Sequence, residues 1–377
     1  MKNCRLISLL IICLLLANCK EHKTSVAERL QKELDNTVSS KFAWTPGVSL
    51  SVYAPEDAII WTGTAGVSDL DNFSNFHIDQ PFRIASVAKT FVAAAILRLQ
   101  EEGQLSIEDP ISQFISDHHL QLLEADGYQI NKITIRHCLD HTSGLYDYVF
   151  GSSAHPSPYI AMIRAQTEKK WTRTEQLEGA VRWGAPLGPP GQSQHYGDTG
   201  YILLGEILET ITGLNLGDAV EQLIDYEKIG LTSTWMETVQ PPKNALPLVR
   251  CYYDRIDFSQ VDASVDLFGG GGLISTTADL SRFFYHLFNG DVFQLEATLE
   301  EMLSLTTPSK DNEVYGLGIK SVKVFGHFIH GHDGLWDTFA YYSPENKAAI
   351  AIHFTDGGND YLIKRVISIL DQYQESR

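Results

Sequence analysis

A serine and a lysine stand three residues apart in the apolar run "RIASVAKTFVAAAI", as Ser86 and Lys89. Residues at i and i+3 share one face of a helix, so the two side chains can meet there. A serine hydroxyl is a weak nucleophile that needs a nearby base, and a lysine removed from water can be that base. Backbone N–H groups at a helix start also favour developing negative charge. The alternative, an exposed pair on a surface helix, is not excluded by this pair alone.

Four further segments follow the serine segment along the chain. All five are "FRIASVAKTFVAAAILRLQEEGQLSIEDPI", "ITIRHCLDHTSGL", "PPGQSQHYGDTGYILLGEILETITG", "GGGGLISTTADLSRF" and "HGHDG". Together they resemble the serine β-lactamase and penicillin-binding protein family, whose signatures include S-x-x-K, and in particular its class C β-lactamase-like branch. The resemblance spans residues 48–355. It implies hydrolysis through an acyl-serine, without a metal or another cofactor.

The resemblance assigns a role to each matching residue. Ser86 would be the acylated nucleophile, and Lys89 would accept or relay its proton. Tyr196, in "YGD", would move a proton between nucleophile, lysine and leaving group. The N–H groups of Ser86 and Leu335 would form an oxyanion hole, and Gly334 would let the strand edge approach the substrate. Two such preorganised amides can lower a barrier by about 3–4 kcal/mol each.

Asp198 departs from the family pattern, because many relatives have asparagine there. A carboxylate cannot donate a hydrogen bond to a substrate carbonyl, and it would hold Lys89 in its charged form. The same aspartate could instead cap a helix that starts at Thr199. The two roles are compatible, and both stay open.

His332 is a second departure, since many members have lysine in the third motif (K-T-G) and others have H-x-G. A neutral imidazole attracts a substrate carboxylate less than an ammonium does. We therefore expect activity on carboxylate-bearing substrates to rise as the pH falls and His332 gains a proton. The two departures together argue against efficient hydrolysis of penicillins or cephalosporins.

Two pairs of histidines invite a metal interpretation. His330 and His332 would share one face of a strand, and His137 and His141 are spaced i and i+4. Neither pair completes a zinc-hydrolase signature, since H-x-H-x-D-H is broken in "HGHDG" and a zincin needs Glu where Cys138 stands. We expect these histidines to be structural or to face substrate, and we expect no metal site.

The "HTSG" turn offers two hydroxyls, Thr142 and Ser143, but no base is spaced to serve either. We expect this turn to brace the helical part of the molecule near the site. The four glycines at 269–272 are expected to permit close backbone packing against the site.

Residue patterning also predicts the elements that hold these side chains. The β-rich runs at 48–54 and 58–67 flank the turn residues "PED", which predicts a hairpin. Two strands around "PEN" and an amphipathic helix at 361–373 are predicted near the end of the sequence. Thr276, three residues before Asp279, is typical of a capped helix start.

Strands at both ends, with mostly helical patterns between them, predict one sheet domain that encloses a helical domain. The predicted fold class is α+β and β-lactamase/transpeptidase-like, with an antiparallel sheet flanked by helices and an inserted, mostly helical domain. The boundaries are a signal peptide at 1–18, a tether and first helix at 19–45, a discontinuous sheet domain at 46–90 and 265–377, and a helical domain at 91–264. A cleft between such domains is the default place for a site.

Composition is that of a globular chain with a large core, since 44% of the 377 residues are hydrophobic and 20% are charged. A formal net charge of −18 argues against a nucleic-acid groove as the main partner. After the two cysteines of the predicted signal and Cys19, only Cys138 and Cys251 remain. The pair could form one disulfide, but its surroundings have the pattern of buried helix and strand, which favours two free thiols in the core.

The first residues predict export. Lys2 and Arg5 precede an apolar run at 6–17, which is too short to span a bilayer and is typical of a secretory signal. The stretch "LLANCK" resembles a bacterial lipoprotein signal, with Cys19 as the lipid-bearing residue, although Asn18 departs from the usual small residue. The alternative is ordinary secretory cleavage nearby. Either way we expect the protein to work outside the cytoplasm, lipid-anchored in the first case and facing the periplasm or cell surface.

These observations predict an extracytoplasmic serine hydrolase that cleaves an amide or ester bond through an acyl-serine. A D,D-peptidase, D-amino-acid amidase or esterase activity is ranked above a class C β-lactamase. The second alternative is a non-catalytic protein of the same fold that binds peptidoglycan or another ligand. The expected partners are a small-molecule or peptide substrate derived from the cell wall, and a membrane through the lipid anchor, but no nucleic acid.

Overall fold

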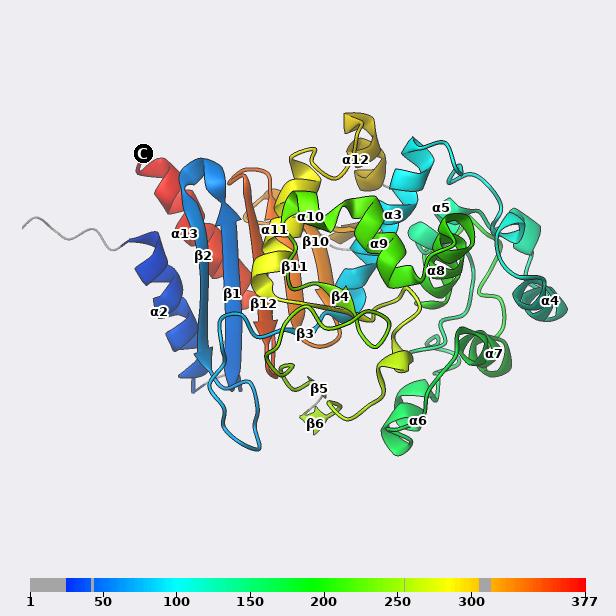
Figure 1. Cartoon of the computed structure of the whole chain (residues 1–377), viewed down its shortest axis with the longest axis horizontal. Coiled ribbons are helices and arrows are strands. Elements are labelled where there is room, and N and C mark those ends of the chain that lie inside the picture. The colour runs from blue at the N-terminus through cyan, green and yellow to red at the C-terminus, as the bar shows by residue number, and fades with distance from the viewer. Residues whose placement is uncertain (1–24, 42–43, 254, 305–312) are drawn as a thin grey trace, which may run out of the picture.

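A seven-stranded antiparallel sheet forms the centre of the computed structural model, which describes residues 25–41, 44–253, 255–304 and 313–377 (Figure 1). The strand order is β2-β1-β12-β11-β10-β9-β8, so strands from both ends of the chain meet in the middle. The strands are β1 (Gly47–Ala54), β2 (Ile59–Gly66), β8 (Glu313–Tyr315), β9 (Lys320–Val324), β10 (His327–Gly334), β11 (Thr338–Ser343) and β12 (Ala348–Phe354). The predicted α+β fold class is confirmed, and so are the hairpin around "PED" and the two strands around "PEN".

Helices cover both faces of this sheet (Figure 1). On one face α2 (Val26–Val38) and α13 (Tyr361–Glu375) pack together, and alternate β1 residues such as Leu50 and Val52 join their apolar cluster. On the other face α11 (Thr277–Phe288) receives the intervening β1 residues. Ser49 Oγ lies 2.8 Å from Thr277 Oγ1, and Ser51 Oγ lies 2.8 Å from Ser281 Oγ. Because side chains alternate along a strand, β1 is buried on both sides.

The helix start predicted at Thr276 is confirmed. Its side chain accepts a hydrogen bond from the backbone N–H of Asp279 at 3.2 Å, as an N-cap residue does. Gly290 follows the helix with φ of 79°, a conformation that favours glycine.

The other helices form a mostly helical part beside the sheet (Figure 1). They are α3 (Ala88–Glu101), α4 (Asp117–Ala125), α5 (Ile135–Leu139), α6 (Tyr159–Ala165), α7 (Arg173–Trp183), α8 (Thr199–Thr212), α9 (Leu216–Ile224) and α10 (Tyr226–Ile229), with α12 (Glu296–Leu303) near the sheet. Helix α3 packs against α8, α9 and α12 and is buried from Ala88 to Leu99. Burial on all sides explains why its sequence is apolar from Phe91 to Leu97.

A small three-stranded sheet fixes the chain next to the serine. Its strands are β3 (Phe82–Arg83), β7 (Leu273–Ser275) and β4 (Trp235–Met236), in the order β3-β7-β4. The Ile84 N–H continues the ladder by donating to the Leu273 carbonyl oxygen at 3.1 Å. A separate pair, β5 (Tyr252–Tyr253) with β6 (Ile256–Asp257), forms a short hairpin in the loop before β7.

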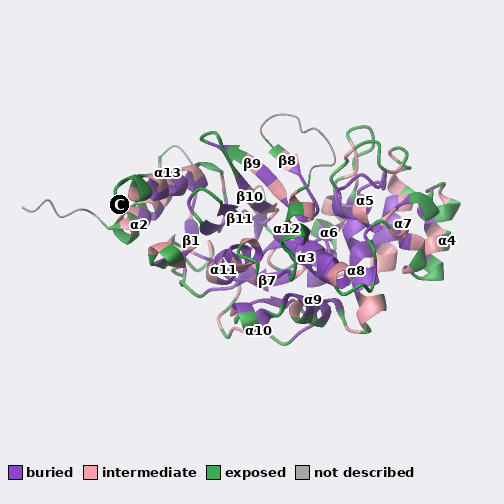
Figure 2. Cartoon of the chain, turned by 90° about the horizontal axis from the view of Figure 1, so that it is seen from above, coloured by how far each residue is buried: buried purple, intermediate pink, exposed green. Residues whose placement is uncertain are grey.

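The larger apolar cluster is continuous between the helical part and the sheet, and buried residues run through both in Figure 2. The division at 91–264 therefore stays a prediction about domains. Cys138 and Cys251 are buried free thiols, as predicted. No helix within the described ranges is long and apolar enough to cross a membrane. The predicted signal peptide and Cys19 lie outside the described residues.

Candidate active site

Ser86 lies in a turn of 3₁₀ helix (Ala85–Val87) between β3 and α3. Ala85, just before it, has a φ of 44°, a left-handed conformation that residues other than glycine rarely adopt. The β3–β7 ladder on one side and α3 on the other hold this strained turn. The serine is thereby fixed at the N-terminal end of α3, as the sequence predicts, and it lines a cavity.

Lys89 is wholly buried, one helical turn after Ser86. Its Nζ donates to Ser86 Oγ at 2.8 Å and to the carbonyl oxygen of Gly270 at 2.8 Å, and it forms an ion pair with the Asp198 carboxylate. Two of the three donors of this ammonium are thus hydrogen-bonded, and the Asp198 carboxylate balances its charge. An unpaired ammonium would be costly at this depth, so Asp198 is what permits it.

Tyr196 brings a second proton-carrying group to Ser86. Its hydroxyl is hydrogen-bonded with the serine side chain, and Lys89 Nζ lies 5.1 Å from its ring centroid. Although the side chain is 41% exposed, burial of the hydroxyl and the negative charge of Asp198 raise its pKa well above the usual 10. Tyr196 is therefore a neutral phenol that can pass a proton on, and not a resting tyrosinate.

Asp198 occupies the N-cap position of α8, but its side chain makes no capping hydrogen bond. Its carboxylate lines the cavity and pairs with Lys89. Its backbone N–H donates to Asp147 Oδ1 at 3.0 Å. The cap location and the site role thus coexist, and the carboxylate serves the site.

The glycine run packs directly against these groups, as expected. A Cβ on Gly270 would lie 2.9 Å from the carboxyl carbon of Asp198, and one on Gly271 would overlap the carboxylate of Asp266. The two glycines therefore leave room for two aspartates beside the serine.

The end of β10 lies against the serine turn. A Cβ on Gly334 would overlap the carbonyl oxygen of Ile84, so only glycine allows this approach. Leu335, the next residue, lines the same cavity as Ser86. The oxyanion hole of the Ser86 and Leu335 N–H groups stays a prediction that this approach supports.

His332 lies beneath the site and is only 1% exposed. Its Nε2 is 2.9 Å from the Tyr315 hydroxyl, and its Nδ1 is 2.7 Å from the carbonyl oxygen of Asp333. Burial, with the positive charges of Lys320 and Lys89, lowers its pKa well below the usual 6.5. The expectation that His332 gains charge through the ordinary histidine range is therefore wrong, because an imidazolium would be desolvated beside two cations. Nor does His332 line the cavity at Ser86.

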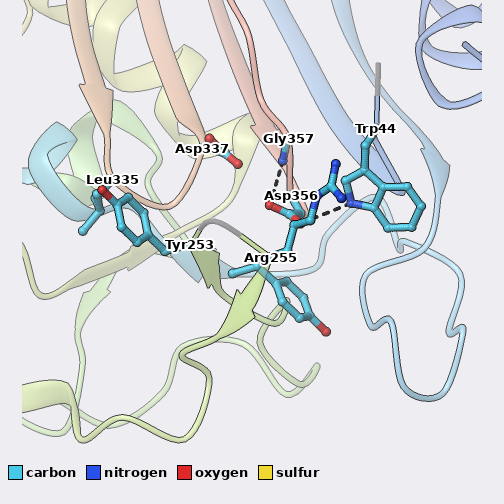
Figure 3. A pocket seen from close by; sticks show the side chains of 8 residues that line it. Trp44, Tyr253, Arg255, Leu335, Asp337, Asp356 and Gly357 are labelled. Carbon is cyan, nitrogen blue, oxygen red and sulfur yellow. Dashed lines mark hydrogen bonds between the residues drawn. The ribbon is translucent and has the colours of Figure 1, made fainter. Parts of the chain in front are cut away.

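The cavity at Ser86 is small, about 40 Å³. The described residues that line it are Ala85, Ser86, Val149, Phe150, Tyr159, Ile160, Ile163, Asp198, Val265, Asp266, Leu335 and Trp336. Mostly apolar walls thus surround one nucleophile and two carboxylates. Leu335 also borders a larger cavity of about 400 Å³ (Figure 3). There the Trp44 indole donates to Asp356 at 3.2 Å, and Arg255 lies close by.

Sequence reasoning missed two of the groups around this cavity. Asp266 belongs to no motif and stands three residues before the glycine run, so only the folded chain shows where it lies. Asp147 supports Asp198 from a loop that the motifs do not cover. The sequence predicts only that the "HTSG" turn braces the helical part of the molecule, whereas the ring centroid of His141 lies 4.3 Å from that of Tyr196.

The other hydroxyls and histidines do not join the site. Thr142 Oγ1 donates to Asp140 at 2.6 Å, and His330 Nδ1 lies 2.7 Å from Ser321 Oγ. Within the described part of the chain, no group of three or more His, Cys, Asp or Glu residues could hold a metal ion.

Comparisons with known proteins identify the family of this chain. The family model described as Beta-lactamase matches residues 34–374. The chain is 27% identical over 200 residues to Esterase EstB of Burkholderia gladioli, covering 53% of this chain and 49% of the esterase. It is 24% identical over 304 residues to Penicillin-binding protein 4* of Bacillus subtilis, covering 75% of this chain and 61% of that protein. The chain therefore spans about half to three fifths of the length of these curated relatives.

Solved structures share the fold over nearly the whole chain. A D-stereospecific amidohydrolase from a Streptomyces species matches with a TM-score of 0.74 and 26% identity, over 91% of this chain and 97% of that one. The D-amino acid amidase of Ochrobactrum anthropi, complexed with D-phenylalanine, matches with a TM-score of 0.76 and 23% identity, over 93% and 99% of the two chains. The second likeness concerns the fold alone.

Gly334→Ala tests the close approach of β10 to the serine turn. The added methyl overlaps the Ile84 carbonyl, so β10 must move away, and we expect the labelling rate of Ser86 by a fluorophosphonate to fall at least about tenfold. Gly326→Ala, in the turn just before β10, is the control for backbone strain alone, because its φ of 94° disfavours alanine while a Cβ there meets no atom within 4 Å. An unchanged labelling rate in folded Gly334→Ala protein would contradict the predicted oxyanion hole.

Asp198→Asn tests the carboxylate beside Lys89. The amide removes a negative charge from the cavity and adds a donor for a substrate carbonyl. We expect the ratio of penicillin acylation to ester hydrolysis to rise severalfold, measured by mass spectrometry and by ester turnover. A ratio equal to that of the unmodified protein would indicate that the carboxylate does not influence substrate choice.

Proposed function

Because this chain belongs to the beta-lactamase family, we propose that it is a serine hydrolase that cleaves an amide or ester bond through an acyl-Ser86 intermediate. One observation carries the proposal. Ser86 Oγ lies 2.8 Å from Lys89 Nζ, is hydrogen-bonded with the Tyr196 hydroxyl, and lines a cavity. A nucleophile with two groups that can take or give its proton is the requirement for acyl transfer.

Acylation begins when Ser86 Oγ attacks the substrate carbonyl carbon. Lys89 donates to Ser86 Oγ and to the Gly270 carbonyl and is ion-paired with Asp198, so it must release a proton before it can take the one from Ser86. Asp198 is the acceptor placed to hold that proton. Tyr196, a neutral phenol, then gives its proton to the leaving amine or alcohol as the bond to the carbonyl carbon breaks, and it regains one from Lys89, which holds the proton taken from Ser86. Water hydrolyses the acyl-Ser86 ester by the reverse sequence of proton transfers.

The charges of the cavity favour D-amino-acid amidase or esterase chemistry over β-lactam hydrolysis, and D,D-peptidase activity stays a candidate on the names of the relatives, because its substrates also carry a carboxylate. Penicillins and cephalosporins carry a carboxylate, and the cavity presents the carboxylates of Asp198 and Asp266 with no lysine or arginine among the described residues that line it. The names of the relatives, which include an esterase, an amidohydrolase and a penicillin-binding protein, support the same classes. We propose a small amide or ester, or a short peptide from the cell wall, as the substrate.

A binding protein without catalysis is the second candidate from the sequence. A binding module does not need a buried lysine that contacts a serine hydroxyl, and burying that lysine costs stability unless every donor is matched. The geometry therefore favours the hydrolase.

We expect Ser86→Ala to abolish the covalent adduct formed with a fluorophosphonate, measured by intact-protein mass spectrometry. Lys89→Ala should leave the protein folded but slow labelling about a hundredfold or more, since a positioned base contributes on this scale. Ser143→Ala is the matched control and should label normally, because Ser143 Oγ accepts only from the Leu145 N–H among the contacts described. Persistent labelling of Ser86→Ala would point to another nucleophile.

A metal chelator should leave the rate of fluorophosphonate labelling and of substrate hydrolysis unchanged.

We also propose that the protein is exported and anchored by a lipid on Cys19. This proposal rests on the signal pattern of residues 1–19. Cys19→Ser should remove incorporation of labelled palmitate and release the protein from the membrane fraction. Cys13→Ser, within the apolar run, should leave both unchanged. Unlabelled but processed wild-type protein would favour ordinary secretory cleavage.

A further inference from the structure

Two ion pairs neutralise most of the charge around the Ser86 cavity. Lys89 pairs with Asp198, and Arg83 Nε and Nη2 donate to Glu237 at 2.7 and 3.0 Å. Asp266 lies within electrostatic reach of both pairs but belongs to neither. Asp266 is therefore a carboxylate in the cavity that forms no ion pair with either of the neighbouring cations.

The hydrogen bonds distinguish Asp266 from the other aspartate nearby, Asp147. The carboxylate of Asp147 accepts from the N–H groups of Asp198, Val149 and Phe150 at 2.8 to 3.2 Å. No described residue donates a hydrogen bond to the carboxylate of Asp266. Its backbone is nevertheless fixed, because its N–H donates to the Ala263 carbonyl at 3.2 Å. Asp266 is thus a positioned acceptor with unused capacity.

The cavity that contains Asp266 also contains the nucleophile. Ser86 and Leu335 line it together with Asp266, and its walls include Val149, Ile163 and Trp336. No lysine or arginine is among the described residues that line it. Its volume of about 40 Å³ has room for about three water-sized groups. That space suits an ammonium, its α-carbon and a methyl group beside the carbonyl that Ser86 attacks.

We propose that Asp266 binds the protonated α-amino group of the substrate's acyl portion, so that the enzyme prefers unblocked aminoacyl amides and esters with a compact apolar side chain over N-acylated ones. The inference rests on the proposed acyl-serine function and adds a residue that decides specificity. A cation at this position restores the charge balance of the cavity, and a carboxylate without internal donors is its natural partner. An N-acyl group offers Asp266 no charge and needs more space than the walls leave.

The proposal predicts how the preference changes with pH. Burial and the negative charge of Asp198 raise the pKa of Asp266 to about 7, while the cations of Lys89 and Arg83 act in the opposite direction. Glu237 also faces it, as do the neutral phenols of Tyr148 and Tyr159. Below this pKa Asp266 is protonated and loses its attraction for an ammonium. The preference should therefore rise as the pH increases through about 7 and fall again near 8, where a free α-amino group loses its proton.

The test compares kcat/KM for alanine p-nitroanilide, in both enantiomers, with that for the N-acetylated forms. Wild type should prefer the better free-amine enantiomer by about ten- to a hundredfold, the value of a charge-assisted hydrogen bond. Asp266→Asn should remove most of that preference through a higher KM for the free amine, with the N-acetyl substrate unaffected. Asp337→Asn, which changes a carboxylate of the neighbouring cavity, should keep the preference.

A parallel fluorophosphonate assay separates the two proposals. Two results would overturn the role of Asp266 alone. One is wild-type protein that labels at Ser86 but shows no free-amine preference. The other is an Asp266→Asn variant in which kcat/KM falls equally for the free-amine and the N-acetylated substrate. Protein that neither labels nor cleaves any substrate would overturn the acyl-serine function. Slower labelling in the presence of alanine amide than of N-acetylalanine amide, lost in Asp266→Asn, would support the role of Asp266 without turnover.

Discussion

The buried ammonium of Lys89 dictates how the chain must fold around the serine. A cation with no exposed surface is tolerated only if each of its donors finds an acceptor, and the chain supplies these acceptors from three distant places. The turn before α3 provides the hydroxyl of Ser86, the glycine run provides the Gly270 carbonyl, and the start of α8 provides the Asp198 carboxylate. Any change that separates these three segments leaves a charge unpaired in the interior, so stability and the arrangement of the site depend on the same contacts.

Close backbone contacts are the second condition of this arrangement. Gly270, Gly271 and Gly334 stand where a methyl group would collide with a carboxylate or a carbonyl oxygen. The absence of side chains at these positions brings three segments of backbone within reach of one hydroxyl. The positive φ of Ala85 has the same cause, because the turn must place Ser86 in the narrow space between β10 and α8. Backbone atoms therefore make up much of the surface around Ser86, and few side chains are in contact with it.

Local patterns predicted the parts of this structure that depend on neighbours in sequence. The β1–β2 hairpin, the Thr276 cap and the strands around "PEN" follow from turn residues and alternation, and the Ser86–Lys89 contact follows from helical spacing. Burial could not be predicted in the same way. Burial, with the positive charges of Lys320 and Lys89, lowers the pKa of His332, and Asp198 turns from its cap position toward Lys89. Asp266 reaches the cavity only because the loop that carries it folds back over the serine, and no spacing in the sequence records that path.

The antiparallel pairing of β1 with β12 places Val48 opposite Phe354, so the middle of the sheet forms only after β12 has been added. The turn at Ser86 is likewise held by β10, which follows it by most of the chain's length. Contacts between residues so far apart in sequence form slowly, because the entropy cost of closing a long loop comes before the contacts can stabilise the fold. During synthesis, a growing polypeptide that has already produced the nucleophile still lacks the strand needed to hold it. The hydroxyl therefore acquires its surroundings late in folding, only after β10 has packed against the serine turn, so a partly folded chain does not yet hold an assembled site.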